Sequence, residues 1–264
     1  MSTFTLLGSE LRLRRRAMIG WSIALVLLSL MMLAFYPAVR DQPGLDEMML
    51  AIPEEMRPML GALDMTSPAG YLSSQLYLYF LPALLFVFAI GRGAAAIAGE
   101  EEDRTLDLLL SQPISRTALY AQKLLALLAQ IALLVTASAL PLMVFGNGVG
   151  LTVPLVQLLA VNVQLFVVVT ALSLFALAVG AATGRRGVGI AVASGYAFIG
   201  YLVDGLGQTV TWLEHFRPLT TWRWYEADAI LRNGFILGGT FVLLLAAVCI
   251  TVLGIWGFGR RSLR

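Results

Sequence analysis

The sequence predicts an all-α, polytopic membrane protein with six transmembrane helices, and three observations support this fold class. Of the 264 residues, 59% are hydrophobic and 13% are charged, whereas a soluble domain carries about 25% charged residues. Six apolar stretches approach or exceed the length that a helix needs to cross a bilayer core, about 20 residues. The basic residues, finally, gather in alternate connections between these stretches, as the positive-inside rule describes.

The six stretches are expected to form one transmembrane domain over residues 1–264. Each should be helical, because lipid offers no hydrogen-bond partner to an open backbone. The first follows four arginines, and its apolar run is too long for the h-region of a signal peptide, about 7–15 residues. We therefore expect it to be retained as a span. The expected spans cover residues 17–36, 72–98, 118–145, 155–183, 187–203 and 235–258.

The charges orient these spans with both termini in the cytoplasm. Of the 18 basic residues, 13 lie in the segments assigned to the cytoplasm, that is, the alternate connections and the span ends beside them. The fifth stretch is the shortest, and without it Arg260 and Arg261 would lie outside. The expected location is the bacterial cytoplasmic (inner) membrane, with lipid as a partner and no nucleic acid. The basic residues assigned to the inside are Arg12, Arg14, Arg15, Arg16, Arg92, Arg104, Arg116, Lys123, Arg185, Arg186, Arg260, Arg261 and Arg264.

Two outer connections carry local structure in this topology. Residues 37–70 are rich in proline, methionine and acids, and we expect a short surface helix from Leu45 to Leu50. Residues 205–233 are partly apolar and contain Trp212, Trp222 and Trp224. Because indole rings prefer the headgroup region, this connection is expected to form short helices at the outer leaflet.

Several kinds of chemistry are missing from the sequence. A single Cys249 and a single His215 exclude an intramolecular disulfide and a multi-histidine metal site. The predicted spans contain no Asp, Glu or His, and Arg92 and Lys123 are assigned to span ends, which argues against a proton-driven carrier. No GxxxxGK[ST] loop is present to hold nucleotide phosphates. Ser194 and His215 are better explained as a packing residue and a loop histidine than as a protease pair. No catalytic, cofactor-binding or metal-binding residue is assigned.

One cytoplasmic segment, residues 99–116, has the pattern GEEEDRTLDLLLSQPISR. It predicts an amphipathic helix over residues 100–112, with acids in its first turn and an i,i+4 pair of Glu100 with Arg104. Leu106, Leu109 and Leu110 form its apolar ridge. Pro113 ends the helix, and Ser115 caps the next span. Such a ridge either docks in a groove of a partner or rests on the inner leaflet, whose negative charge disfavours the acids.

This segment resembles the coupling-helix signature of ABC-2 type permeases, the membrane subunits of many bacterial ABC exporters. That family often has glycine where this chain has Arg104. The six-span plan, the basic amphipathic segment from Phe4 to Arg16 and the long loop before the last span are also similar. The matching residues are Gly99, Glu100, Glu102, Thr105, Leu106, Leu109, Leu110, Pro113, Ser115 and Arg116.

The resemblance implies a non-enzymatic permease subunit of an ATP-driven exporter. Two copies of a cytoplasmic ATPase would hold Mg-ATP, and a second permease copy or a related permease would complete the complex. The substrate is left open, and the rival interpretations are an intramembrane enzyme and a non-transporting membrane anchor. The residues that the resemblance assigns to ATPase coupling are Glu100, Glu101, Glu102, Asp103, Thr105, Leu106, Leu109, Leu110, Pro113, Ser115 and Arg116.

The resemblance also places the second and fifth spans near the central pathway. In the fifth span, Gly187, Ala191 and Gly195 have the spacing that lets helices approach closely. They are expected to form a dimer or pathway contact, or to pack within one subunit. In the fourth span, interhelical hydrogen bonding is a better explanation for Asn162 and Gln164 than contact with substrate.

Overall fold

Six long helices form the structure, a computed structural model that describes residues 15–42, 44, 66–106 and 115–260. Within these residues, six segments are long and apolar enough to cross a membrane, and no strand occurs. The predicted fold class is thereby confirmed. The expected surface helix from Leu45 to Leu50 lies outside the described residues. The six spans are Arg15–Arg40 (α2), Pro68–Ala95 (α5, η1 and α6), Arg116–Val149 (α9 and η2), Leu155–Thr183 (α10), Arg186–Leu206 (α11) and Leu237–Arg260 (α14).

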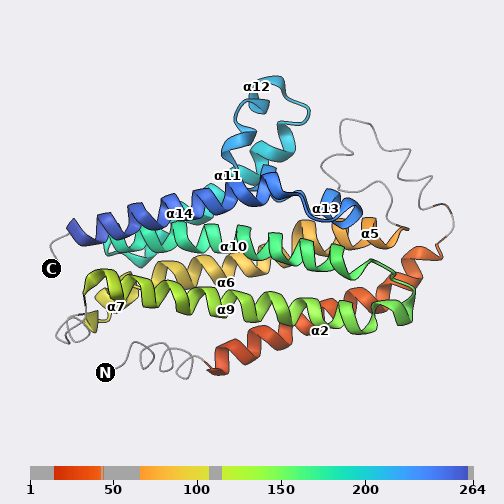
Figure 1. Cartoon of the computed structure of the whole chain (residues 1–264), viewed down its shortest axis with the longest axis horizontal. Helices are drawn as coiled ribbons and strands as arrows, with labels where there is room; N and C mark the ends of the chain where they lie inside the picture. The colour runs from red at the N-terminus through yellow and green to blue at the C-terminus, as the bar shows by residue number, and fades with distance from the viewer. Residues whose placement is uncertain (1–14, 43, 45–65, 107–114, 261–264) are drawn as a thin grey trace.

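Helix α10 lies at the centre of the bundle and packs against α6, α9, α11 and α14. Helix α2 packs on α9 at one side, where Ser29 Oγ donates a hydrogen bond to the carbonyl oxygen of Ser138 at 2.8 Å. The start of α2 and the end of α14 lie at the same end of the bundle, on the left in Figure 1. This end, called the terminal end below, also carries the short helix α7, Ala98–Glu102.

Helices α6 (Leu81–Ala95) and α10 cross with their backbones in close contact. A Cβ atom added to Gly93 would lie 2.2 Å from the carbonyl oxygen of Ser173, and one added to Gly180 would lie 2.9 Å from that of Ala94. Ser173 Oγ donates to the carbonyl oxygen of Ala89 at 3.0 Å. Glycine on both helices therefore sets the distance between the second and fourth spans.

The second span contains a nine-residue π-helix, η1 (Leu72–Phe80), between α5 (Pro68–Tyr71) and α6. The amide of Leu81 donates to the carbonyl oxygen of Leu76, five residues earlier. Pro82 follows directly, and its ring cannot donate a hydrogen bond and would clash with the preceding turn of a regular α-helix. The wider π-helix accommodates this proline. Such segments are rare and often occur at functional sites.

The connection from α11 to α14 forms short helices, as predicted, and α12 stands away from the bundle in Figure 1. Hydrogen bonds tie its second half to the spans. Tyr225 Oη donates to the carbonyl oxygen of Tyr77 at 3.0 Å, and burial raises the pKa of the Tyr225 hydroxyl. The elements of the connection are α12 (Thr211–Glu214), η3 (Arg217–Leu219), η4 (Trp222–Trp224) and α13 (Ala227–Asn233).

Asn162 and Gln164 act as structural ties, which confirms the interpretation favoured from the sequence. Asn162 Nδ2 donates to the hydroxyl of Tyr77 at 2.9 Å, joining α10 to η1. Gln164 Nε2 donates to the carbonyl oxygen of Trp224, and Gln164 Oε1 accepts from Thr240 Oγ1 at 2.6 Å. Both side chains thus join α10 to its neighbours through polar contacts inside the bundle.

Candidate functional site

The segment expected to form one helix over residues 100–112 is interrupted instead. Helix α7 ends at Glu102, and Arg104 has a left-handed backbone with φ of +57°. The acids therefore end a short helix rather than begin a long one, which corrects the prediction. The left-handed turn redirects the chain, and Thr105 N donates to the carbonyl oxygen of Glu100 at 2.8 Å. This turn lies at the position where the ABC-2 signature often has glycine, the residue that adopts such a backbone without steric cost.

Glu100 forms a partly buried ion pair with Lys123 of α9. Lys123 Nζ lies 2.7 Å from Glu100 Oε1, and the two side chains are 8% and 23% exposed. Thr105 Oγ1 also donates to the Glu100 carboxylate. Lys123 lies seven residues into α9, about 10 Å from the start of that helix. Because the span Arg116–Val149 has 34 residues, the lysine lies near one end of it, and its assignment to the end of the membrane span stays a prediction.

A second link joins α7 to the fifth span. Glu102 Oε1 accepts a hydrogen bond of 2.8 Å from the amide of Arg186, the first residue of α11. A carboxylate at the N-terminus of a helix satisfies an amide that has no partner within the helix and meets the positive end of the helix dipole. Glu100 and Glu102 therefore fasten α7 to two different spans, α9 and α11.

Arg92 and Gln130 extend this junction from α6 to α9. Arg92 Nε donates to Gln130 Oε1 at 3.1 Å, and Arg92, Glu100, Lys123 and Gln130 all line one small cavity. The spans α6, α9 and α11 are consequently linked through polar contacts at the terminal end. We call the set Arg92, Glu100, Glu102, Lys123 and Gln130 the polar junction. Sequence reasoning singled out its glutamates but missed Arg92, Lys123 and Gln130 as their neighbours.

The other expected coupling residues have different environments. Leu106 is 3% exposed and belongs to a core cluster with Ile97, Leu119 and Tyr120. It cannot also enter a partner's cleft, so its predicted role as a docking residue is corrected. Glu101 is half-buried and Asp103 is exposed. Leu109, Leu110 and Pro113 lie outside the described residues, and their docking role stays a prediction.

Ser115 and Arg116 begin the third span. Ser115 Oγ accepts from the amide of Ala118 at 3.1 Å, which confirms the predicted cap. The guanidinium of Arg116 donates to the carbonyl oxygen of Phe258 at 3.3 Å and lies 5.9 Å from the centre of the Phe258 ring. The start of α9 is thereby held against the end of α14.

Replacing Arg104 with glycine is expected to stabilise the protein by about 0.5 kcal/mol. The left-handed conformation costs a non-glycine residue about 1–2 kcal/mol, and part of that gain is offset by the greater freedom of glycine in the unfolded chain. Thermal unfolding of the purified protein in detergent measures the change. Arg104→Ala is the matched control, because it removes the same side chain but keeps the strain. Equal unfolding temperatures for the two variants would rule out this explanation.

Two open faces lie along α6 and α11. A Cβ atom added to Gly91 on α6, or to Gly187 or Gly195 on α11, would meet no atom within 4 Å. By contrast, one added to Gly189 would lie 3.0 Å from the carbonyl oxygen of Ala176. The bundle is thus packed through Gly189, Ala193, Ala197 and Gly200, which are buried. Within the described residues, Gly187 and Gly195 thus make no close packing contact, and Ala191 is exposed as well.

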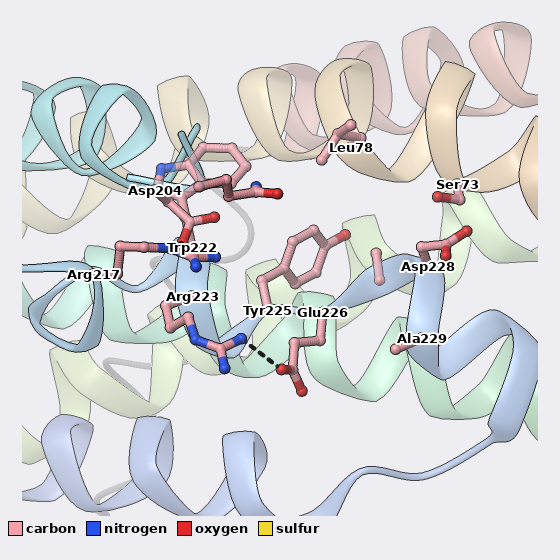
Figure 2. A pocket seen from close by; sticks show the side chains of 12 residues that line it. Ser73, Leu78, Asp204, Arg217, Trp222, Arg223, Tyr225, Glu226, Asp228 and Ala229 are labelled. Carbon is pink, nitrogen blue, oxygen red and sulfur yellow. Dashed lines mark hydrogen bonds and ion pairs between the residues drawn. The ribbon is translucent and has the colours of Figure 1, made fainter. Parts of the chain in front are cut away.

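Cavities lie at both ends of the α6–α11 pair. At the terminal end, a cavity of about 250 Å³ is lined by residues of α2, α6 and α11, among them Trp21, Gly91 and Arg186. At the opposite end, a cavity of about 340 Å³ lies between η1, the end of α11 and the connection to α14. Figure 2 shows Asp204, Arg217, Tyr225 and Asp228 around this second space.

The pair considered for an intramembrane protease gains no support from the structure. Ser194 lies on the exposed face of α11, and His215 is exposed in the connection that follows. A nucleophile and base of a membrane protease need to be held together and shielded from water.

A family model described as "ABC-2 family transporter protein" matches residues 4–263. A search of curated proteins finds no match to the chain.

Proposed function

Because that match covers nearly the whole sequence, the chain belongs to the ABC-2 transporter family, and we propose that it is the permease subunit of an ATP-driven exporter. It is a multi-pass membrane protein for transport. In the proposed complex, two copies of a separate ATPase hydrolyse Mg-ATP in the cytoplasm, and a second permease completes the pathway. The terminal end faces the cytoplasm of a bacterial cell, as the positive-inside rule predicts.

The polar junction is the observation that best supports this proposal. Helix α7 is only five residues long, yet it is bound to α9 through Glu100 and to α11 through Glu102. Leu106 anchors the chain that follows α7 in the core. A force applied to residues 107–114 would therefore reach two spans directly. Leu109 and Leu110 lie in that segment, and we propose that they contact the ATPase.

The pathway is proposed to follow the α6–α11 pair. Its glycines leave an open face among the described residues, and one cavity lies at each of its two ends. The rings of Tyr79 of η1 and Tyr201 of α11 are in contact, with centres 6.3 Å apart. This contact narrows the proposed pathway at the end opposite to the terminal end. A second subunit placed against Gly187, Ala191 and Gly195 would enclose the space between the cavities.

Leu109→Glu is expected to weaken ATPase association and abolish transport while membrane levels stay normal. Burying a leucine contributes about 1.5–3 kcal/mol, and the new carboxylate would lie in an apolar cleft without a partner. Glu101→Ala is the control, since a half-exposed rim charge contributes about 0–1 kcal/mol. Co-purification with the co-expressed ATPase and a transport assay measure both variants. Wild-type binding and transport by Leu109→Glu would contradict the coupling role.

A further inference from the structure

The cavity at the end of the bundle opposite to the terminal end adjoins a smaller cavity, and the two share lining residues. Leu78, Asp204, Gln208 and Trp222 line both. The larger measures about 340 Å³ and the smaller about 60 Å³. Together they reach the lower part of the size range of small-molecule sites, about 300–1,000 Å³. Among the described residues, Asp204, at the end of α11, is therefore the acidic residue that contributes to both parts.

The smaller cavity combines one carboxylate with three aromatic rings. Among the described residues that line it, Asp204 alone is charged, and the aromatic side chains are Tyr79, Tyr201 and Trp222. The rings of Tyr201 and Trp222 meet edge to face with centres 5.4 Å apart. Aromatic faces attract organic cations, and a carboxylate beside them adds a full negative charge. This combination favours a cation that carries apolar groups.

The charged side chains that line the larger cavity, among the described residues, all belong to ion pairs. Three acids line it, Asp204, Glu226 and Asp228, against two arginines, Arg217 and Arg223. Arg223 is paired with Glu226 at 2.9 Å (Figure 2). Asp228 is paired with Arg232, which does not line the cavity. Each of the three acids is therefore paired with an arginine, and the charges around the larger cavity balance, so a preference for cations depends on Asp204 and the neighbouring aromatic rings.

Arg217 occupies the position that a bound cation would take beside Asp204. Its Nε lies 3.1 Å from Asp204 Oδ1, and both side chains are 20% exposed. The guanidinium comes from η3 in the connection, whereas Asp204 belongs to the spanning helix. A ligand cation that binds Asp204 would thus compete with Arg217 and release the connection from α11.

We propose that these joined cavities bind an organic cation with an apolar body, held by Asp204 and by the rings of Tyr79, Tyr201 and Trp222. The site lies on the α6–α11 pathway, so this inference rests on the proposed function and names a substrate class for it. The apolar body contacts the rings, and the cationic group replaces Arg217 at the carboxylate.

Benzyltrimethylammonium is a suitable probe, with neopentylbenzene as its uncharged analogue of the same shape. Binding to the permease, purified without ATPase in an uncharged detergent, is measured by calorimetry. We expect the cation to bind at least about tenfold more tightly than the neutral analogue, which corresponds to about 1.4 kcal/mol. Displacement by short-chain phosphatidylcholine would assign the natural ligand to lipid headgroups, and lack of displacement would assign it to free cations.

Substitutions at the ion pair have opposite expected effects. Asp204→Asn should weaken binding of the cation at least about tenfold, whereas Arg217→Gln should strengthen it because the internal competitor is removed. The double variant should bind as weakly as Asp204→Asn. Asp41→Asn is the control, since it breaks the exposed pair of Asp41 with Arg40, and it should leave binding unchanged. Thermal unfolding of each variant verifies that it is folded.

Two results would overturn the proposal: equal binding of the cation and its neutral analogue, or unchanged binding in a folded Asp204→Asn variant. Neither bears on ATPase association, which the Leu109→Glu experiment measures separately. Conversely, the protein could bind the cation through Asp204 and yet associate with no ATPase. That result would support the cation site and contradict the proposed function as an exporter subunit.

Discussion

Gly93→Ala is expected to prevent stable folding in the membrane. The added methyl group would lie 2.2 Å from the carbonyl oxygen of Ser173 and 3.0 Å from the carbon of the same carbonyl. Both atoms belong to the backbone of α10, so no side-chain rotation relieves the clash. Overpacking typically costs about 1–3 kcal/mol, and a clash with the backbone of the central helix places this variant at or above the upper limit.

Gly91→Ala provides a matched comparison on the same helix. A methyl group at Gly91 would meet no atom within 4 Å, and alanine is favoured over glycine inside a helix by about 0.5–1 kcal/mol. This variant should therefore be as stable as the wild type or slightly more so. Membrane levels and thermal unfolding in detergent measure both. A Gly93→Ala protein with a wild-type level and unfolding temperature would refute the close crossing of α6 and α10.

The sequence alone predicts the six spans well, because hydropathy reports directly on the length of chain that lipid can surround. The fifth span was the weakest, and the structure extends it to Arg186–Leu206. The end of this helix includes Asp204, which the hydropathy-based boundary at residue 203 left outside. The Ser115 cap was also predictable, since it depends on local contacts only.

The packed face of each helix is harder to predict. Gly187, Ala191 and Gly195 have the same spacing as Gly189, Ala193 and Ala197, yet only the second set is packed inside the bundle. Lipid and protein interior are both apolar, so small residues on either face give the same sequence signal.

The contacts of the polar junction were not predicted, because they depend on the left-handed backbone turn at Arg104. The pattern of residues does not indicate that turn. A continuous helix would have placed Glu100 beside Arg104, four residues on. The left-handed turn at Arg104 breaks this helical spacing. Glu100 instead forms an ion pair with Lys123, which lies on the next span, α9. The single lysine of the chain was a signal, although its identity alone did not reveal its partner.

Glu100→Gln is expected to destabilise the protein by about 3 kcal/mol, the lower part of the range for breaking a buried ion pair. Lys123 is 8% exposed, so its ammonium group would lose the carboxylate without gaining access to water. Exposed pairs behave differently, and Arg232→Gln, which breaks the pair of Arg232 with Asp228, should change stability by about 0–1 kcal/mol. Unfolding of each purified variant in detergent measures these differences.

The double variant Glu100→Gln with Lys123→Met tests whether the loss of stability in Glu100→Gln comes from leaving the Lys123 charge without its partner. Removing both charges avoids an unpaired buried ion, and an apolar replacement of a buried pair is often neutral or stabilising. The double variant should therefore be more stable than Glu100→Gln alone, with a coupling energy of about 0.5–3 kcal/mol between the sites. If the junction transmits motion from α7 to α9, this folded protein should still bind the ATPase but transport more slowly. Additive losses of stability in the two single variants would show that Glu100 and Lys123 do not interact.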